Sequence, residues 1–301
     1  MPSTIQPNKR KSTLYRKEKI VAVLFILPPL IGFAIFMVGT LIFSGSLALT
    51  EFHPDGIQTR FGGIHNFRAL FVGDPYSEEF TRAIVTTLVL LLSVPFSIIG
   101  GLVLAGFLNE KKIFGHKVYR FMLYLPAVSS AVALNIIWRY IFSSSFGLTA
   151  IIFGEGVYFL SGWRVRVAII IRNVWAGLGF SMLLYLAGMK NISESYYEAA
   201  DIDGAGVLTK FFKITLPMLT PVTFFLIITG IIGGMQSFAE SEVFARGTPY
   251  GRTVVYFIWN WGIARPAGFG IANAAALLLA AVIMIITFVQ FKFADRWVYS
   301  D

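Results

Sequence analysis

The chain has 301 residues, of which 56% are hydrophobic and 14% are charged, and its formal net charge is +9. A soluble domain carries about 25% charged residues, so this composition excludes an ordinary soluble enzyme and a disordered chain. Cysteine is absent, which removes disulfide frameworks, thiolate nucleophiles and cysteine-based metal sites. The chain is therefore predicted to be an integral membrane protein.

Long apolar stretches recur along the chain and predict its architecture. A transmembrane helix needs about 20 mostly apolar residues, and six stretches meet this requirement. They lie at approximately 21–49, 83–108, 119–141, 165–188, 218–238 and 271–291. The first is too long for the apolar region of a cleaved signal peptide. The sequence therefore predicts an all-α fold of six transmembrane helices.

The lysine residues are distributed unevenly among the segments that separate these spans. All eleven lie before the first span, between the second and third, between the fourth and fifth, or after the sixth. Positively charged loops remain on the cytoplasmic side of a membrane, so both termini are predicted to be cytoplasmic. We divide the chain into a basic cytoplasmic tail, 1–18, and a transmembrane domain, 19–301, whose main cytoplasmic loop is 190–217.

Several features that enzymes and self-powered transporters require are missing from the sequence. There is no G-x-x-x-x-G-K-[ST] phosphate loop, and no span contains the carboxylate or histidine that proton-coupled transporters use as a relay. The three histidines lie outside the spans without metal-ligand spacing, and no Ser/His/Asp cluster lies near one span. No basic patch interleaved with aromatic residues indicates a nucleic-acid partner. We therefore expect no catalytic residue, metal or cofactor in this chain, and favour a transporter driven by another protein.

The loop 190–217 between the fourth and fifth spans is the most informative stretch. Ser193 can start a helix, and Gly204 permits a sharp turn. An amphipathic segment follows over 207–214, and Pro217 is predicted to stop it at the mouth of the fifth span. The pattern predicts two short helices that meet at a glycine elbow on the cytoplasmic face.

A family motif occupies this loop. Its E-A-A, G and I-x-L-P elements follow one another with the spacing found in permease subunits of binding-protein-dependent ABC importers, and the chain resembles that family. The residues that the resemblance assigns to ATPase coupling are Glu198, Ala199, Ala200, Asp203, Gly204, Ile214, Leu216 and Pro217. Further matches to the sugar-permease branch, which includes the larger maltose permease subunit and the glycerol-3-phosphate permeases, lie at Leu27-Pro28, 63–67 and Leu125-Pro126.

The resemblance implies a type I importer permease in the bacterial cytoplasmic membrane, surrounded by lipid and not itself an enzyme. A second homologous permease, expected to be a different chain, would lie beside it. Two ATPase subunits that hold ATP and Mg²⁺ would receive the two elbows, and an extracytoplasmic solute-binding protein would deliver substrate. The sequence lacks the two extra N-terminal spans and the large outer domain of the larger maltose subunit, so it resembles the minimal six-span form.

Other functions remain compatible with the residues. The preferred hypothesis is an importer for a sugar, an oligosaccharide or a sugar derivative. The same architecture could carry glycerol phosphate or another polar solute. A channel or secondary transporter that works alone would not need the elbow motif, which would then be a solvated connector. A scaffold for the ATPases would assemble with them but would move no solute.

Polar and small residues in the fourth and fifth spans indicate where a solute could pass. The candidates are Asn173, Gly177 and Phe180 in the fourth span, and Thr229, Gly233 and Gln236 in the fifth. Within each set the residues are four and three positions apart, which places them on one helix face. Both sets resemble the sugar-contacting positions of the maltose permease. Helix packing through small and polar residues is the alternative interpretation.

Two arginines also lie within the predicted spans. Arg139 and Arg172 fall toward the outer halves of the third and fourth spans. They could attract the carboxylate or phosphate of an anionic sugar. Alternatively, they could extend to the membrane interface or pair with acidic residues of the outer loops.

Overall fold

The computed structural model describes residues 9–52, 58–73, 76–109, 115–153, 158–265 and 268–299. Residues 1–8 of the predicted basic tail, together with Lys111 and Lys112, lie outside the described residues. The described residues are helical apart from one antiparallel pair of short strands, β1 (Thr50–Phe52) and β2 (Gln58–Phe61). The prediction of a helical protein is confirmed.

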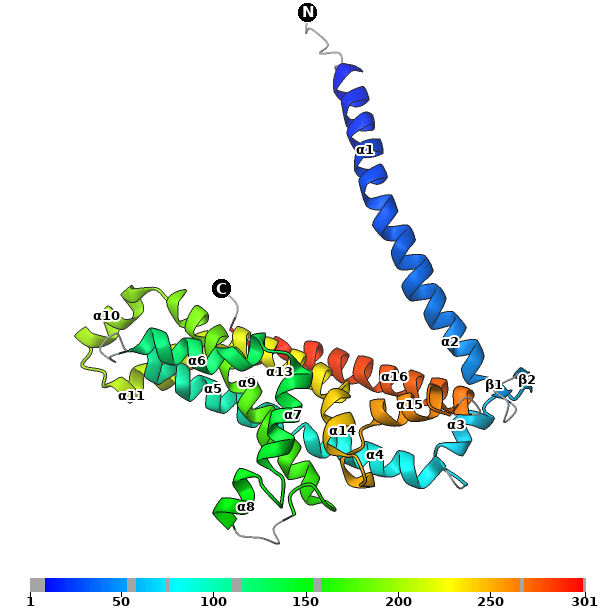
Figure 1. The fold of residues 1–301 in the computed structure, drawn as a ribbon. Coiled ribbons are helices and arrows are strands. Elements are labelled where there is room, and N and C mark those ends of the chain that lie inside the picture. The colour runs from blue at the N-terminus through cyan, green and yellow to red at the C-terminus, as the bar shows by residue number, and fades with distance from the viewer. Residues whose placement is uncertain are drawn as a thin grey trace, which may run out of the picture.

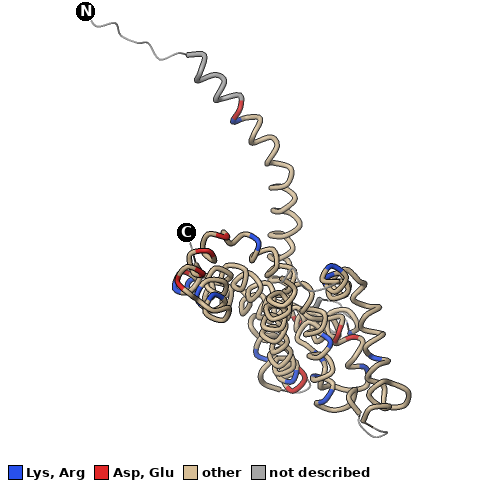
Figure 2. The backbone as a smooth tube through the Cα atoms, turned by 90° about the vertical axis from the view of Figure 1, so that its left-hand side faces the viewer, with Lys and Arg blue, Asp and Glu red and all other residues tan. Residues whose placement is uncertain are grey.

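A long helical rod extends away from the rest of the molecule (Figure 1). It consists of α1 (Lys9–Phe33), the π-helical η1 (Ala34–Gly39) and α2 (Thr40–Ala48). No charged residue follows Lys19 along the rod (Figure 2). Its most apolar stretch is not buried anywhere in the described structure, and Phe25 is 79% exposed. A helix that is apolar on all sides belongs in lipid or against another protein, so the rod corresponds to the first predicted span.

The strands and α3 (His65–Ala69) hold the base of this rod. Asn66 is buried, and its Nδ2 donates to the carbonyl oxygens of Ala48 and Thr50 at 2.8 Å each. A buried amide needs such partners because leaving it without them would cost free energy. Asn66 therefore fixes the turn from the end of α2 into the first strand.

The body of the molecule is built around five helices. They are α4 (Tyr76–Leu90), α5 (Ser93–Asn109), α9 (Arg164–Lys190), α13 (Thr220–Met235) and α16 (Phe269–Ala294). The most extensive contact between two helices joins α5 and α9, and small residues allow their close approach. A Cβ at Gly101 would overlap Ser181 across this contact. Close approach through glycine is typical of helices that pack within membranes.

Among the described residues, four helices are long and apolar enough to cross a membrane, or up to six if each of two bent pairs counts as one span. The first bent pair is α6 (His116–Val128) with α7 (Ala131–Ile141), and it bends by 103°. The span predicted over 119–141 is therefore interrupted by a sharp bend. Ser129 is extended, and Ser130 accepts a hydrogen bond from a backbone N–H of α7. Serine side chains compete in this way with helical backbone bonds, so a new helix starts here.

The second bent pair leads from the loop that carries the family motif into α13. It comprises α11 (Val207–Lys210), the π-helical η2 (Phe211–Thr215) and α12 (Leu216–Met218), and the chain bends by 58° before α13. The remaining elements are α8 (Leu148–Phe153), α10 (Glu194–Ile202), α14 (Ala239–Phe244), the 3₁₀ helix η3 (Pro249–Gly251) and α15 (Val254–Gly262). Figure 1 shows α10 and α11 at one end of the body, with α3 and the strands at the other.

Candidate functional site

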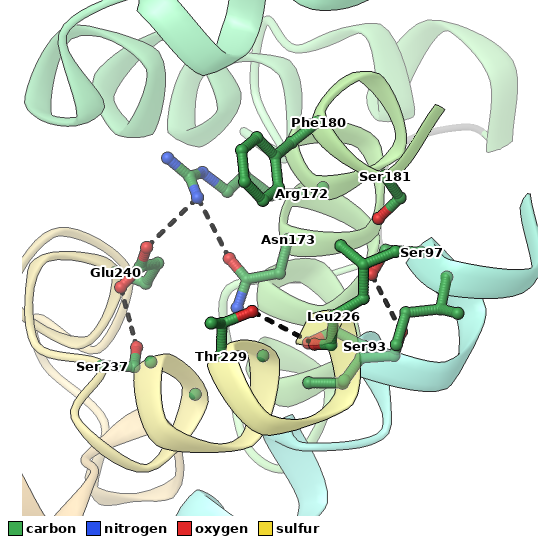
Figure 3. A pocket seen from close by; sticks show the side chains of 16 residues that line it. Ser93, Ser97, Arg172, Asn173, Phe180, Ser181, Leu226, Thr229, Ser237 and Glu240 are labelled. Atoms are coloured by element: carbon green, nitrogen blue, oxygen red, sulfur yellow. Dashed lines mark hydrogen bonds and ion pairs between the residues drawn. The ribbon is translucent and has the colours of Figure 1, made fainter. Parts of the chain in front are cut away.

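A cavity of about 350 Å³ lies between α5, α9, α13 and the start of α14 (Figure 3). Six of the eight predicted solute-path residues line it, namely Arg172, Asn173, Gly177, Phe180, Thr229 and Gly233. The structure therefore brings together most of two sets that lie more than fifty positions apart in the sequence.

The other two predicted residues lie elsewhere. Arg139, on α7, lines a separate cavity of about 710 Å³ together with Glu242 and Arg246. Gln236 is the residue after α13, is exposed, and is not among the described lining residues of the first cavity. Helical spacing placed Gln236 with Thr229, but α13 ends at Met235, so the periodicity no longer applies.

Glycines of α9 and α13 allow both helices to approach α5 beside the cavity. A Cβ at Gly177 would lie 2.8 Å from the Cβ of Ser97, and one at Gly230 would lie 2.7 Å from Val94 Cγ1. A Cβ at Gly233 would meet no atom within 4 Å. The packing interpretation therefore holds for Gly177, which also lines the cavity, whereas Gly233 faces open space.

Arg172 is paired with an acidic residue of α14. Its Nη1 donates to Glu240 Oε1 and to Asn173 Oδ1, both at 3.1 Å. Ser237 Oγ donates to the other carboxylate oxygen of Glu240 at 2.7 Å. The sequence left open whether Arg172 attracts an anionic sugar or pairs with an acidic residue of the chain. The structure shows it paired with an acidic residue, Glu240.

Sequence reasoning missed Glu240 and Ser237 as cavity residues. A signal was present, because Ser237 and Glu240 have the S-x-x-E spacing that occurs at helix starts. They stand directly before and within α14 (Ala239–Phe244). This spacing predicts contact between the two side chains, but it does not predict that Arg172 on α9 lies opposite them.

Three hydroxyl groups around the cavity donate to backbone carbonyls three or four residues earlier in the chain. Ser93, Ser97 and Thr229 donate to the carbonyl oxygens of Leu90, Val94 and Phe225 at 2.7, 2.9 and 2.7 Å, respectively. A hydroxyl that donates in this way still has oxygen lone pairs to offer. The ring of Phe180 adds an apolar surface (Figure 3).

The loop that carries the family motif forms the predicted elbow. Ser193 precedes α10, and its Oγ accepts from the Ser195 N–H. Gly204 has φ of +74°, the left-handed conformation that glycine adopts without strain. Lys210 of α11 forms an ion pair with Asp201 of α10. Two helices joined at a fixed glycine turn are therefore confirmed.

The motif residues are distributed over both arms of this elbow. Glu198, Ala199 and Ala200 lie on α10 and Asp203 follows it, whereas Ile214, Leu216 and Pro217 lie in η2 and α12. Tyr197 of α10 and Thr215 of η2 approach to 2.8 Å between their hydroxyl oxygens. The two arms are therefore tied to each other near the base of the loop.

Pro217 does not stop the helix as predicted. It occupies the first turn of α12, and the chain remains helical to Met218 before bending at Leu219. Proline is tolerated in a first helical turn because its missing N–H is not needed there. The π-helical turn η2 ends at Thr215, so Pro217 lies in the first turn of the helical segment that follows it.

The segment 295–299 packs against the start of α13, directly after the elbow. The Tyr299 N–H donates to Thr220 Oγ1 at 2.8 Å, and the rings of Trp297 and Phe224 are 5.8 Å apart between centroids. The contact joins the residues after α16 to the start of α13. Sequence reasoning missed it, because neither segment carries a local pattern that specifies its partner.

Comparison with known proteins identifies the family. The family model described as "Binding-protein-dependent transport system inner membrane component" matches residues 69–299. The chain belongs to this family. The match includes the cavity residues and the whole elbow, so both features are parts of an ABC importer permease.

Curated relatives span almost the whole permease. The probable ABC transporter permease protein YesP of Bacillus subtilis is 32% identical, over 97% of this chain and 96% of its own length. The lactose transport system permease protein LacF of Rhizobium radiobacter is also 32% identical, over 93% and 96%. The family assignment therefore applies to the chain as a whole.

A solved structure has the same fold. A bacterial ABC transporter involved in the import of the acidic polysaccharide alginate contains a chain that matches with a TM-score of 0.81 and 26% identity, over 96% of this permease and 99% of that chain. The same transporter was also solved with an alginate-bound periplasmic protein. The fold of this permease is thus that of an ABC importer permease.

Proposed function

We propose that this permease carries a sugar, an oligosaccharide or a sugar derivative into the cell. The observation that supports this most directly is the 350 Å³ cavity, in which hydroxyl and amide groups lie beside an aromatic ring among apolar helices. Sugar hydroxyls need hydrogen bonds, whereas the faces of a sugar ring pack on aromatic surfaces. Relatives that transport lactose and arabinooligosaccharides support the same solute class.

In this proposal the energy comes from ATPase subunits in the cytoplasm. The elbow, formed by α10 and α11, docks into an ATPase that binds ATP and Mg²⁺, and closure of the ATPases moves α13 through α12. The helices α12 and α13 meet at the 58° bend at Leu219. A solute-binding protein supplies the sugar from outside, as the solved complex with a periplasmic protein suggests by analogy.

A second, homologous permease completes the assembly in this proposal. The helical rod, α1 to α2, is the feature that supports it, because its apolar side chains do not pack on the described body. The cavity is also open on one side, where a second permease would close it. We propose a heterodimer, with six spans in this chain and with both termini and the tail 1–18 in the cytoplasm.

Uptake by the reconstituted transporter tests the sugar assignment. Asn173→Leu removes an amide from the cavity, and loss of such a hydrogen bond costs about 1–3 kcal/mol, so uptake should fall about five- to hundred-fold. Co-purification of the ATPases should be unchanged. Asn191→Leu is the matched control, since Asn191 caps the other end of α9. Normal uptake by Asn173→Leu would overturn the role of Asn173.

Cysteine labelling tests the topology in this cysteine-free chain. Ser145 is exposed in the predicted outer loop, and Thr209 is exposed on the elbow. An impermeant thiol reagent added to intact cells should label Ser145→Cys and leave Thr209→Cys unlabelled. The opposite pattern would overturn the orientation.

Glycerol phosphate is the second candidate solute. The relatives include sn-glycerol-3-phosphate transport system permease proteins, such as UgpA of Pectobacterium atrosepticum, at 29% identity. Uptake of radiolabelled glycerol 3-phosphate in the same proteoliposomes distinguishes this solute from a sugar. Uptake of either solute without ATP would instead favour a channel or a secondary transporter.

A further inference from the structure

The cavity walls that this chain supplies carry no net charge. Arg172 and Glu240 are the two ionisable residues among the described lining, and they lie 3.1 Å apart (Figure 3). Their side chains are only 8% and 15% exposed. The pair has no net charge, so its potential falls off with distance more steeply than that of an arginine alone. A solute in the cavity therefore meets a dipole and not a positive site.

Four of the five hydroxyl groups among the described lining residues commit their protons within the protein, Ser181 being the fifth. Ser93, Ser97 and Thr229 commit their protons to backbone carbonyls, and Ser237 commits its proton to Glu240. Each of these oxygens still has lone pairs that can accept. The cavity therefore suits a ligand that brings its own hydrogen-bond donors.

Asn173 contributes the complementary donor. Its Oδ1 already accepts from Arg172 Nη1 at 3.1 Å, which leaves the Nδ2 protons for a ligand oxygen. A hydroxyl group both donates and accepts, so it matches an amide N–H beside serine and threonine oxygens. A carboxylate or phosphate only accepts, and it would lie against lone pairs with the nearest cation already neutralised.

We propose that the solute of this permease is an uncharged, polyhydroxylated sugar, and that Glu240 determines this specificity by neutralising Arg172. The inference rests on the proposed sugar transport and narrows it. It separates this chain from relatives and neighbours whose solutes are acidic, such as alginate and glycerol 3-phosphate. Glu240 acts through Arg172 and is a positioning residue.

The electrostatic potential of the cavity can be measured without knowing the solute. Gly233→Cys places a thiol in the cavity, where an added Cβ meets no atom within 4 Å. The assembled transporter is treated separately with an anionic sulfonatoethyl and a cationic trimethylammonioethyl methanethiosulfonate. The ratio of their two rates reports the local charge. Ser145→Cys, exposed outside the cavity, provides the reference ratio.

The expected ratio at Gly233→Cys is within about twofold of the reference, because the pair is neutral. Adding Glu240→Gln leaves Arg172 unpaired and should raise the anionic-to-cationic ratio about tenfold or more. Adding Arg172→Gln should lower it by a similar factor. The double variant should return to the reference ratio, which controls for loss of packing in either single variant.

Several results would overturn the proposal. One is a several-fold preference for the anionic reagent before any charge is removed, and another is a Gly233→Cys thiol that reacts with neither reagent. Uptake provides the second test, with galactose and galacturonate as a matched pair supplied to the reconstituted transporter. Uptake of galacturonate with equal efficiency would also overturn it. If neither sugar enters, these two monosaccharides are excluded as solutes, and the reagent ratio still decides the charge of the cavity.

Discussion

In the cavity, polar side chains lie between apolar helices and bond to one another, whereas in the elbow, apolar side chains project outward. Arg172, Glu240 and Ser237 bond to one another within the chain, although the buried Nε of Arg172 has no hydrogen-bond partner. On the elbow, Ile202 and Val207 are 87% and 79% exposed. The polar side chains of the cavity thus find most of their partners within the chain. The apolar side chains of the elbow would be buried only by contact with another protein.

The two regions also differ in what holds their backbones. The cavity helices are held by close packing, as at Gly179, where a Cβ would overlap the carbonyl oxygen of Leu123 on α6. The elbow is held by one left-handed glycine and by the ties between its arms, Tyr197 with Thr215 and Lys210 with Asp201. Substitutions in the first region should therefore affect folding, and those in the second should affect coupling.

The largest effect is expected at Gly179. Gly179→Val must displace α6 from α9, and overpacking of this kind costs about 1–3 kcal/mol or more, so the yield of folded transporter should fall sharply. Gly106→Ala, where a Cβ meets no atom within 4 Å, is the control and should leave the melting temperature in detergent unchanged or slightly raised. Equal stability of the two variants would contradict the close contact.

A severe but purely functional loss is expected at Gly204. Gly204→Asp forces a residue with a Cβ into φ of +74°, at a cost of about 1–2 kcal/mol, and should misdirect α10 relative to the ATPase. Uptake should fall about ten-fold, with weaker ATPase co-purification or uncoupled hydrolysis, while the chain inserts normally. Gly206→Ala is the control, since Gly206 has φ of −69°. If uptake, co-purification and hydrolysis all survive in Gly204→Asp, the loop is a connector.

An intermediate effect is expected from the exposed apolar residues of the elbow. Ile202→Ser removes an apolar side chain whose full burial in a complex would contribute about 1.5–3 kcal/mol. ATPase co-purification should weaken about ten-fold, with the melting temperature of the isolated permease unchanged. Ile263→Ser, 71% exposed after α15 on the outer side, should leave co-purification intact. Equal losses for both variants would argue against the elbow as the docking surface.

The smallest effect is expected where the segment 295–299 meets α13. Thr220→Val removes the acceptor of the Tyr299 N–H, a net loss of about 0.5–1.5 kcal/mol. Hydrogen exchange should become faster in residues 295–299, with at most a twofold change in uptake. Thr209→Val, on the exposed face of α11, is the control. No change in exchange would show that the hydrogen bond from the Tyr299 N–H to Thr220 does not limit the opening of this segment.

Sequence predicted features that depend on local patterns. Hydropathy located the rod and the long helices, and the glycine in the motif located the turn at Gly204. The spacing of Asn173, Gly177 and Phe180 correctly placed three residues on one cavity wall. These succeed because a helix face and a left-handed turn are set by residues close together in the chain.

Features that depend on tertiary contacts were missed or left open. The bend at Ser130 looked like an interrupted span, since a serine pair alone does not distinguish a sharp turn from a tolerated polar site. Gln236 was predicted to lie on the helix face of Thr229, but it is the residue that follows the end of α13. The choice between two partners for Arg172 required knowing that Glu240 returns across the bundle.

The contact between the segment 295–299 and the start of α13 has a consequence for the order of synthesis. These residues follow every other described element in the sequence, so they leave the ribosome after the elbow has already emerged. The start of α13 therefore acquires its final packing only after α16 has been synthesised. Until then, the connection between the elbow and α13 lacks the contacts that residues 297 and 299 supply.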